Sequence, residues 1–251
     1  MSATREFEET GAWLRRFHSA PDAGTRLICF PHAGGSATFY FPVSRAVPPA
    51  VEVLAIQYPG RQDRRHEALI DDIRTLADMV VEQLLPWADR PLALFGHSMG
   101  ATLAFEVALR LEDAGITPVY LFASGRRAPS RYRLEQVHLL DDDALIADMK
   151  RLSGTGSQIL DDDELIRMVL PYVRNDYKAA ETYHYQEGSG LSCPVLALTG
   201  DRDPRVSVED ARAWGEHTCG PFDLRVFNGG HFFINDHAPA ITKEIIECLN
   251  S

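Results

Sequence analysis

Residues 92–100 read LALFGHSMG, so that a serine flanked by glycines comes directly after an apolar run and directly before a helical pattern. A strand that turns sharply into a helix needs small neighbours around the turning residue, and Gly96 and Gly100 provide that space. Such a turn projects the Ser98 hydroxyl from the carboxyl edge of a sheet and aims the Met99 amide at any oxyanion formed there. Because a G-x-S-x-G pattern arises by chance in roughly one chain of this length in ten, its setting between strand and helix carries the prediction of a nucleophile elbow.

Apolar runs and helical patterns alternate along the rest of the chain. The short, nearly continuous apolar runs that predict buried parallel strands lie at 26–30, 51–58, 91–95, 118–123, 194–199 and 223–227. Helical patterns lie between or after them at 70–85, 99–114, 208–215 and 238–249. This alternation is typical of the α/β class, with a doubly wound, mostly parallel sheet that has helices on both faces.

Residues 130–192 interrupt the alternation. They predict two helices, 143–152 and 163–185, joined by a flexible linker at 153–157, with no strand between them. A piece of about 60 residues is too long for an ordinary connection. We therefore expect a helical lid over an active site, and the alternative is a helical subdomain that only enlarges the core. Since no second domain boundary is visible, we expect residues 1–251 to form a single domain.

Composition excludes several classes of protein. The 251 residues are 45% hydrophobic and carry a formal net charge of −11, which fits a globular domain with a large core and makes nucleic acid an unexpected partner. No stretch approaches the ~20 apolar residues of a membrane span, so we expect no membrane partner. The N-terminus lacks the pattern of a secretory signal, so we expect a cytoplasmic protein. We also expect the protein to be a monomer.

Neither the cysteines nor the acidic runs predict a metal site. The four cysteines are scattered, with neither disulfide nor metal-ligand spacing: Cys29, Cys193, Cys219 and Cys248. Acidic runs at 141–143 and 161–164 could suggest a metal site, but each precedes a helical pattern, where carboxylates cap the helix and suit its dipole. We expect no metal and no cofactor.

Candidate partners for the serine follow it in the chain. A serine hydroxyl needs a base to take its proton, and the base needs an acid to hold it. After an elbow of this kind they come in the order acid, then histidine, each beyond a later strand. GDRDP at 200–204 and NGGHFF at 228–233 follow two successive predicted strands. Asp201 and Asp203 are both candidates for the acid, and the position of Asp203 further along its loop favours it modestly.

His231 is the favoured base. The two glycines before it allow the tight loop that must reach back to Ser98. His32 and His97 also lie in predicted site loops, but each only flanks the reactive geometry, and His237 opens the last helix as a weaker competitor.

A second glycine-rich segment, FPHAGG at 30–35, follows the first predicted core strand; we call it the glycine loop. Its glycines permit unusual backbone angles and close approach to a substrate. The Ala33 amide is the expected second oxyanion donor beside Met99. A phosphate cradle is the alternative, but the loop lacks the P-loop lysine and the G-x-G-x-x-G spacing.

Seven stretches together resemble the type II (external, editing) thioesterases of polyketide and nonribosomal peptide pathways, members of the α/β-hydrolase superfamily. They are FPHAGGSA from Phe30, QYPGRQDR from Gln57, LFGHSMGATLAFEVA from Leu94, LFASGRRAP from Leu121, LPYVRNDYKAAETY from Leu170, GDRDP from Gly200 and NGGHFFI from Asn228. The stretches span nearly the whole chain in the family's order. Residues 153–156 depart from the family's usual GGTP and read SGTG, which bears on the shape of the lid and the choice of acyl chain.

The resemblance implies a fold, a reaction and a set of site residues. It implies the α/β-hydrolase fold with a helical lid, Ser98 as nucleophile, Asp203 as acid and His231 as base, with oxyanion donors at Ala33 and Met99. The implied reaction is hydrolysis of aberrant or stalled acyl groups from the phosphopantetheine arm of an acyl or peptidyl carrier protein. Alternatives are a carboxylesterase or acyltransferase using the same serine, or a non-catalytic carrier-binding protein.

Two groups of arginines are candidates for carrier binding. One contains Arg61 and the other contains Arg126 and Arg127, each in a loop beyond a predicted strand. Carrier proteins are typically acidic, so for binding them a local group of basic residues matters more than the negative net charge of the whole chain. We expect these groups to meet the carrier or the pantetheine phosphate; the alternative is ordinary surface arginines.

Overall fold

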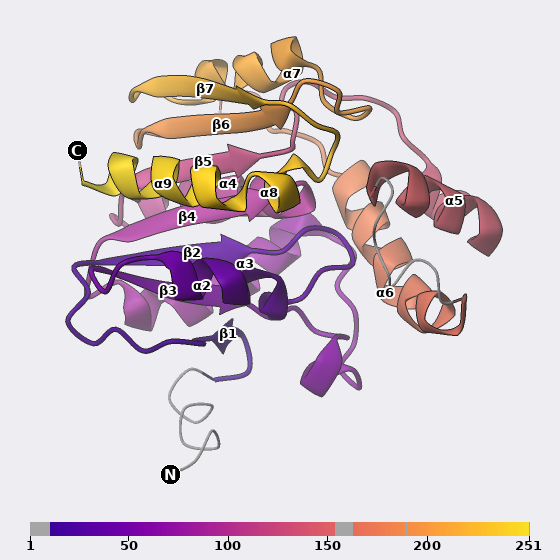
Figure 1. The fold of residues 1–251 in the computed structure, drawn as a ribbon, viewed down its shortest axis with the longest axis horizontal. Coiled ribbons are helices and arrows are strands. Elements are labelled where there is room, and N and C mark those ends of the chain that lie inside the picture. Colours follow the sequence, from indigo (N-terminus) through magenta and orange to yellow (C-terminus); the bar gives the residue numbers. More distant parts are fainter. Residues whose placement is uncertain (1–10, 154–162, 189, 251) are drawn as a thin grey trace.

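A seven-stranded sheet forms the centre of the computed structural model, which describes residues 11–153, 163–188 and 190–250 (Figure 1). The strands are β1 (Leu14–Arg15), β2 (Thr25–Phe30), β3 (Val51–Ile56), β4 (Leu92–His97), β5 (Tyr120–Ser124), β6 (Val195–Gly200) and β7 (Phe222–Phe227). Their order is β1-β3-β2-β4-β5-β6-β7. Only the β1–β3 pair is antiparallel among these strands, so the sheet is mostly parallel, as predicted.

All six predicted strands are present, and their burial explains why the sequence reveals them. β3, β4 and β6 are buried along their whole length, which gives continuous apolar runs. β7 lies at the edge and contains only half-buried and exposed residues. β1 was not predicted, because two residues paired at the opposite edge leave no periodic pattern in the sequence.

Helices cover both faces of the sheet (Figure 1). The helices outside residues 130–192 are η1 (Ala37–Tyr40), α2 (Phe41–Ala46), η2 (Gln62–Arg64), α3 (Ile73–Leu84), η3 (Leu85–Trp87), α4 (Met99–Asp113), α7 (Val208–Arg212), η6 (Ala213–His217), α8 (Phe233–Asp236) and α9 (Ala238–Leu249). Successive residues of β2 divide between two cores: Ile28 packs with α3 and α4, whereas Leu27 packs with η1, α8 and α9. The strand period of two therefore builds one apolar layer on each face.

The predicted helices are confirmed with small shifts at their ends. α3 begins at Ile73 rather than at 70, because the Asp72 side chain caps it by accepting from the Thr75 amide at 2.7 Å. The sequence did not predict η1 and α2, which are short and begin next to the glycine loop.

Residues 130–192, the helical insertion, carry η4 (Val137–Leu139), α5 (Asp142–Ser153) and α6 (Asp163–Glu181) and no strand within their described part. The insertion lies beyond the carboxyl ends of the strands (Figure 1) and has a small core of its own around Leu145 and Ile166. Asp141 accepts from the Ala144 amide at 2.9 Å, so the first acidic run caps α5 as expected. The linker beyond residue 153 and part of the second acidic run lie outside the described residues.

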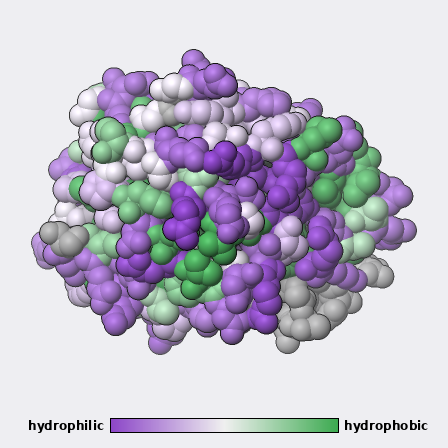
Figure 2. Space-filling model, turned by 90° about the horizontal axis from the view of Figure 1, so that it is seen from above, coloured by the Kyte–Doolittle hydropathy of each residue, from purple (hydrophilic) through white to green (hydrophobic). Residues whose placement is uncertain are grey.

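The insertion carries much of the exposed apolar surface. Leu134, Leu139 and Met168 are 71%, 67% and 73% exposed, and apolar side chains gather on this side of the molecule in Figure 2. In the described part of the chain, no helix has both the length and the apolar character needed to cross a membrane.

Candidate active site

Ser98 sits at the turn between β4 and α4 in a strained backbone conformation, with φ +55° and ψ −120°. The space around the turn requires glycine on either side. A Cβ on Gly96 would lie 2.1 Å from the Gly100 carbonyl oxygen, and one on Gly100 would lie 2.1 Å from that of Phe30. The predicted elbow is therefore formed, since a strained φ at a non-glycine residue persists only where the surroundings enforce it.

A chain of two hydrogen bonds joins Ser98 to a buried carboxylate. Ser98 Oγ lies 3.0 Å from His231 Nε2, and His231 Nδ1 lies 2.8 Å from Asp203 Oδ2. The Asp203 side chain is fully buried and that of His231 is 5% exposed. Water is thus excluded from the bond that orients the imidazole, and the geometry suits a serine–histidine–aspartate triad in which the carboxylate holds the imidazole in place.

The two candidate acids have different partners. Asp201 Oδ1 accepts from the Gly229 amide at 2.8 Å and so fixes the loop that precedes the histidine. Asp203 reaches the imidazole itself and also accepts from the Arg205 amide at 2.8 Å. The geometry thus separates a loop-holding carboxylate from one that faces His231.

The glycine loop lies beside the elbow. Ala33, Gly34 and Met99 line the same cavity as Ser98 and His231. Gly34 has φ +77°, and its amide donates to Asp176 at 2.8 Å. Met99 is the first residue of α4, so its amide has no acceptor within the helix. Ala33 and Met99 both line the cavity beside Ser98, and their role as oxyanion donors stays a prediction.

Two further histidines, His32 and His97, stand near His231, and among the described residues neither ring hydrogen-bonds the Ser98 hydroxyl. Burial, followed by the nearby charge of His231, lowers the pKa of His32 to about 3 and holds that of His97 well below its ordinary value. His97 Nδ1 lies 2.9 Å from the Ser124 hydroxyl. Both imidazoles are therefore neutral near pH 7, and neither competes with His231 for the serine proton.

A cavity of about 530 Å³ extends from Ser98 beneath the helical insertion. Much of its lining is apolar and comes from α5 and α6. The apolar and aromatic lining residues of these two helices, none of which was predicted as a site residue, are Met149, Leu152, Val169, Tyr172, Val173, Tyr177 and Ala180. Those on α6 recur at spacings of three and four, so they share one helix face, and that periodicity was the available signal.

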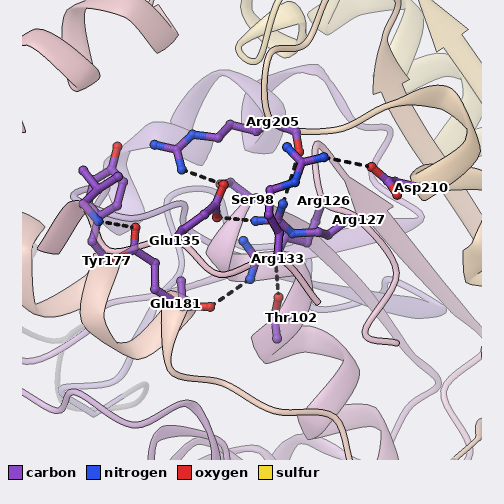
Figure 3. A network of polar contacts seen from close by, with 12 residues as sticks. Ser98, Thr102, Arg126, Arg127, Arg133, Glu135, Tyr177, Glu181, Arg205 and Asp210 are labelled. Atoms are coloured by element: carbon purple, nitrogen blue, oxygen red, sulfur yellow. Dashed lines mark hydrogen bonds and ion pairs between the residues drawn. The ribbon is translucent and has the colours of Figure 1, made fainter. Parts of the chain in front are cut away.

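Charged side chains form another part of the wall (Figure 3). Glu135 pairs with Arg127 and, at 2.9 Å, with Arg205. Arg126 instead donates to the Thr102 hydroxyl at 2.9 Å and to the Ala180 carbonyl at 3.0 Å. Burial, together with Arg127, lowers the pKa of the Arg126 guanidinium to about 10. Among the described residues, no carboxylate oxygen lies within 4.0 Å of that guanidinium.

The structure corrects the expectation that all three candidate arginines are available to a carrier protein. Arg61 is 3% exposed and pairs with the buried carboxylate of Asp176. Arg127 is 7% exposed and pairs with Glu135. Both guanidinium groups are used within the fold, because a buried cation needs a partner. Only Arg126 of the three keeps no carboxylate partner among the described residues.

In the described ranges, no group of three or more histidine, cysteine, aspartate or glutamate side chains is placed to hold a metal ion. The described arrangement around Ser98 consists of a hydroxyl, an imidazole, a carboxylate and backbone amides. These groups can perform nucleophilic acyl transfer.

The sheet, the elbow and the covering helices define an α/β-hydrolase. A family model described as "Thioesterase domain" matches residues 25–249, and the chain belongs to this thioesterase family.

Several named thioesterases are similar in sequence to almost the whole of this chain. A probable cadicidin biosynthesis thioesterase from Streptomyces griseus is 54% identical over 244 residues, which are 97% of this chain and 68% of the relative. Thioesterase PikA5 from Streptomyces venezuelae is 50% identical over 96% of this chain and 86% of its own. The solved structure of BorB, a type II thioesterase from the borrelidin biosynthetic cluster, matches with a TM-score of 0.91 at 53% identity, covering 95% of this chain and 98% of that one.

Proposed function

We propose that this thioesterase hydrolyses acyl groups from the phosphopantetheine arm of acyl or peptidyl carrier proteins and so removes aberrant or stalled chains during polyketide or nonribosomal peptide synthesis. One observation carries the proposal: the Ser98–His231–Asp203 hydrogen-bond chain opens into a cavity large enough for an acyl group. The relatives carry names that refer to biosynthetic pathways, and these names support the choice of substrate.

In the proposed mechanism, His231 Nε2 takes the Ser98 proton as Oγ attacks the thioester carbonyl carbon. Amides of Ala33 and Met99 donate to the oxyanion, each contributing about 3–4 kcal/mol to the transition state. The tetrahedral intermediate collapses, the C–S bond breaks, and the thiol leaves with the proton from His231. A water molecule then gives a proton to His231 and attacks the acyl-serine carbonyl; the bond to Ser98 Oγ breaks, His231 returns the proton to Oγ, and the free acid leaves.

We assign a lid function to the helical insertion. Its helices α5 and α6 line the cavity opposite Ser98, which would shield the acyl-enzyme from bulk water. Its apolar face suits an alkyl chain, and loose chain selectivity fits an editing role. The insertion and the sheet then belong to one domain, and the protein acts as a monomer on its carrier partner.

Arg126 is the proposed contact for the pantetheine phosphate. It lines the cavity and also a neighbouring small depression that Arg131 and Arg133 share. Arg131 and Arg133 are exposed, with side chains 47% and 49% accessible. A basic strip thus leads from the surface to the cavity, although Arg131 and Arg133 also pair with carboxylates.

The decisive experiment measures the intact mass of a panel of acylated carrier proteins after incubation with the enzyme. Loss of the acyl mass, with Ser98→Ala as the inactive control, is the expected result. Retention of every acyl group would contradict the proposal. Faster hydrolysis of matched oxygen esters would indicate a carboxylesterase, and a new ester or amide formed with an added acceptor would indicate an acyltransferase.

A further inference from the structure

The carboxylate of Asp176, on α6 of the helical insertion, contacts the glycine loop across 142 residues of chain. Asp176 Oδ2 accepts from the Gly34 amide at 2.8 Å and also from the Arg61 guanidinium. Asp176 and Arg61 are each 3% exposed. The mechanism described above does not use this pair, yet it lies next to the proposed oxyanion donor.

Residues of the same helix fix Gly34 from a second direction. A Cβ on Gly34 would lie 2.8 Å from Val173 Cγ2, so the α-carbon of the loop packs directly against α6. Val173 and Asp176 are three residues apart and therefore share a helix face. Together they hold both the N–H and the α-carbon of Gly34.

Other hydrogen bonds of the glycine loop come from two tyrosines outside the helical insertion and from within the loop. The Tyr40 and Tyr58 hydroxyls donate to the carbonyls of Phe30 and Pro31, at 2.7 and 3.0 Å. The Gly35 amide donates to the His32 carbonyl at 2.9 Å. Within the described residues, the Ala33 amide has no such acceptor. The fold thus fixes the loop on both sides of Ala33, and the Ala33 amide itself has no acceptor among the described residues and lines the cavity.

We propose that Asp176 is a positioning residue: by holding Gly34 it aims the Ala33 amide at the oxyanion, so the helical insertion completes the oxyanion hole. This inference rests on the proposed function. Arg61 pairs with the Asp176 carboxylate and orients it, and its guanidinium lies over the Tyr58 and Tyr172 rings at 5.1 and 5.2 Å. It follows that hydrolysis requires α6 to be seated on the loop, because a donor displaced by even 1 Å loses much of its effect.

Two double variants isolate the contact with Gly34. Arg61→Met/Asp176→Asn and Arg61→Met/Asp176→Ala both remove the buried charges, but only the asparagine keeps an acceptor for the Gly34 amide. We expect kcat of the alanine variant to be at least about tenfold below that of the asparagine variant, with KM of an acyl-pantetheine thioester changed less than about twofold. Binding of an alkyl boronic acid, which forms a tetrahedral adduct with the serine, should weaken in parallel.

Asn175→Ala is the matched control. Asn175 also ties α6 to the rest of the fold, by donating to the Ile70 carbonyl at 2.7 Å, without touching the glycine loop. It should leave kcat within about twofold of the wild type. Equal kcat in the two double variants, or an equal loss in Asn175→Ala, would overturn the inference.

If the double variants do not fold, Val173→Ala tests the second contact while leaving the ion pair intact; an unchanged kcat and boronate affinity would then overturn the inference. Failure of the proposed function looks different, because the wild-type enzyme itself would then release no acid from the thioester.

Discussion

Asp201 and Asp203 lie two residues apart on one loop, yet only Asp203 meets the imidazole of His231, while Asp201 holds the amide of Gly229. The loop between β6 and α7 therefore carries one carboxylate for the histidine ring and one for the backbone that presents that ring. This division makes the two residues a natural pair for testing the site.

Asp203→Asn should lower kcat about 10³–10⁴-fold, because the amide no longer holds the imidazole in the tautomer that accepts the serine proton. Asp201→Asn should change kcat less than about tenfold, since its oxygen can still accept from Gly229. Steady-state hydrolysis of one acyl thioester by both variants provides the comparison. Similar losses in the two variants would contradict the assignment of Asp203.

Gly100→Ala should destabilise the fold by at least about 3 kcal/mol, because the added methyl group meets the Phe30 carbonyl oxygen at 2.1 Å. Gly24→Ala is the control, since a Cβ there has nothing within 4 Å. Thermal unfolding would show the difference as a fall in Tm of about 2–4 °C for each kcal/mol. A Tm shared by both variants would mean that the elbow tolerates a side chain.

Stability should fall in acid partly because of His32. Its pKa of about 3 in the folded protein lies below the ordinary value of 6.5, so between these values only the unfolded chain takes up the proton. The free energy of unfolding should therefore fall with pH below 6.5, by about 1.4 kcal/mol per pH unit for this group. Urea unfolding at pH 7.5 and 5.0 measures this loss. Between these pH values, His32→Gln should lose about 2 kcal/mol less unfolding free energy than the wild type. The exposed His66 provides the control variant His66→Gln. An equal loss of unfolding free energy in the wild type and in His32→Gln would refute this role of His32.

Acyl-chain preference should respond to the cavity face of α6. Val169→Phe narrows the cavity and should lower kcat/KM for an octanoyl thioester about tenfold while sparing an acetyl thioester. Met168→Phe is the control, because Met168 is 73% exposed and does not line the cavity. An unchanged octanoyl-to-acetyl ratio in Val169→Phe would exclude this cavity as the acyl site.

Arg126→Gln should raise KM for acyl-phosphopantetheine about tenfold and leave KM for the dephosphorylated acyl-pantetheine unchanged, because a charge-assisted hydrogen bond to phosphate is lost. Kinetics with both substrates provide the measurement, and Arg131→Gln at the exposed end of the basic strip provides the comparison. If the ratio of the two KM values stays constant in Arg126→Gln, the phosphate contact is excluded.

Much of the fold could be predicted because the responsible signals are local. The buried strands show as continuous apolar runs, and the elbow shows as glycines at fixed distances from Ser98. β1 escaped prediction because an antiparallel edge of two residues depends on pairing with β3 rather than on its own pattern. The start of α3 shifted because a side-chain cap at Asp72, not the apolar periodicity, fixes it.

The arginines show the limit of such reasoning. Arg61 and Arg127 were expected to be open to a partner, but each is buried against a carboxylate that lies far away or in an irregular segment. No sequence pattern links Arg61 to Asp176, since 115 residues separate them. Burial of charge is a property of the packed molecule, so the sequence alone could not distinguish a docking arginine from an internal one.

The sequence by itself determined the succession of strands and helices along the chain, the elbow at Ser98 and the choice of His231 as candidate base, because spacing and local sterics encode them. Only the tertiary structure placed Asp203 rather than Asp201 against His231, brought α6 onto Gly34, and enclosed the cavity. These features depend on hydrogen bonds and packing between segments distant in the chain, whose geometry arises only when the sheet and the helical insertion fold against each other.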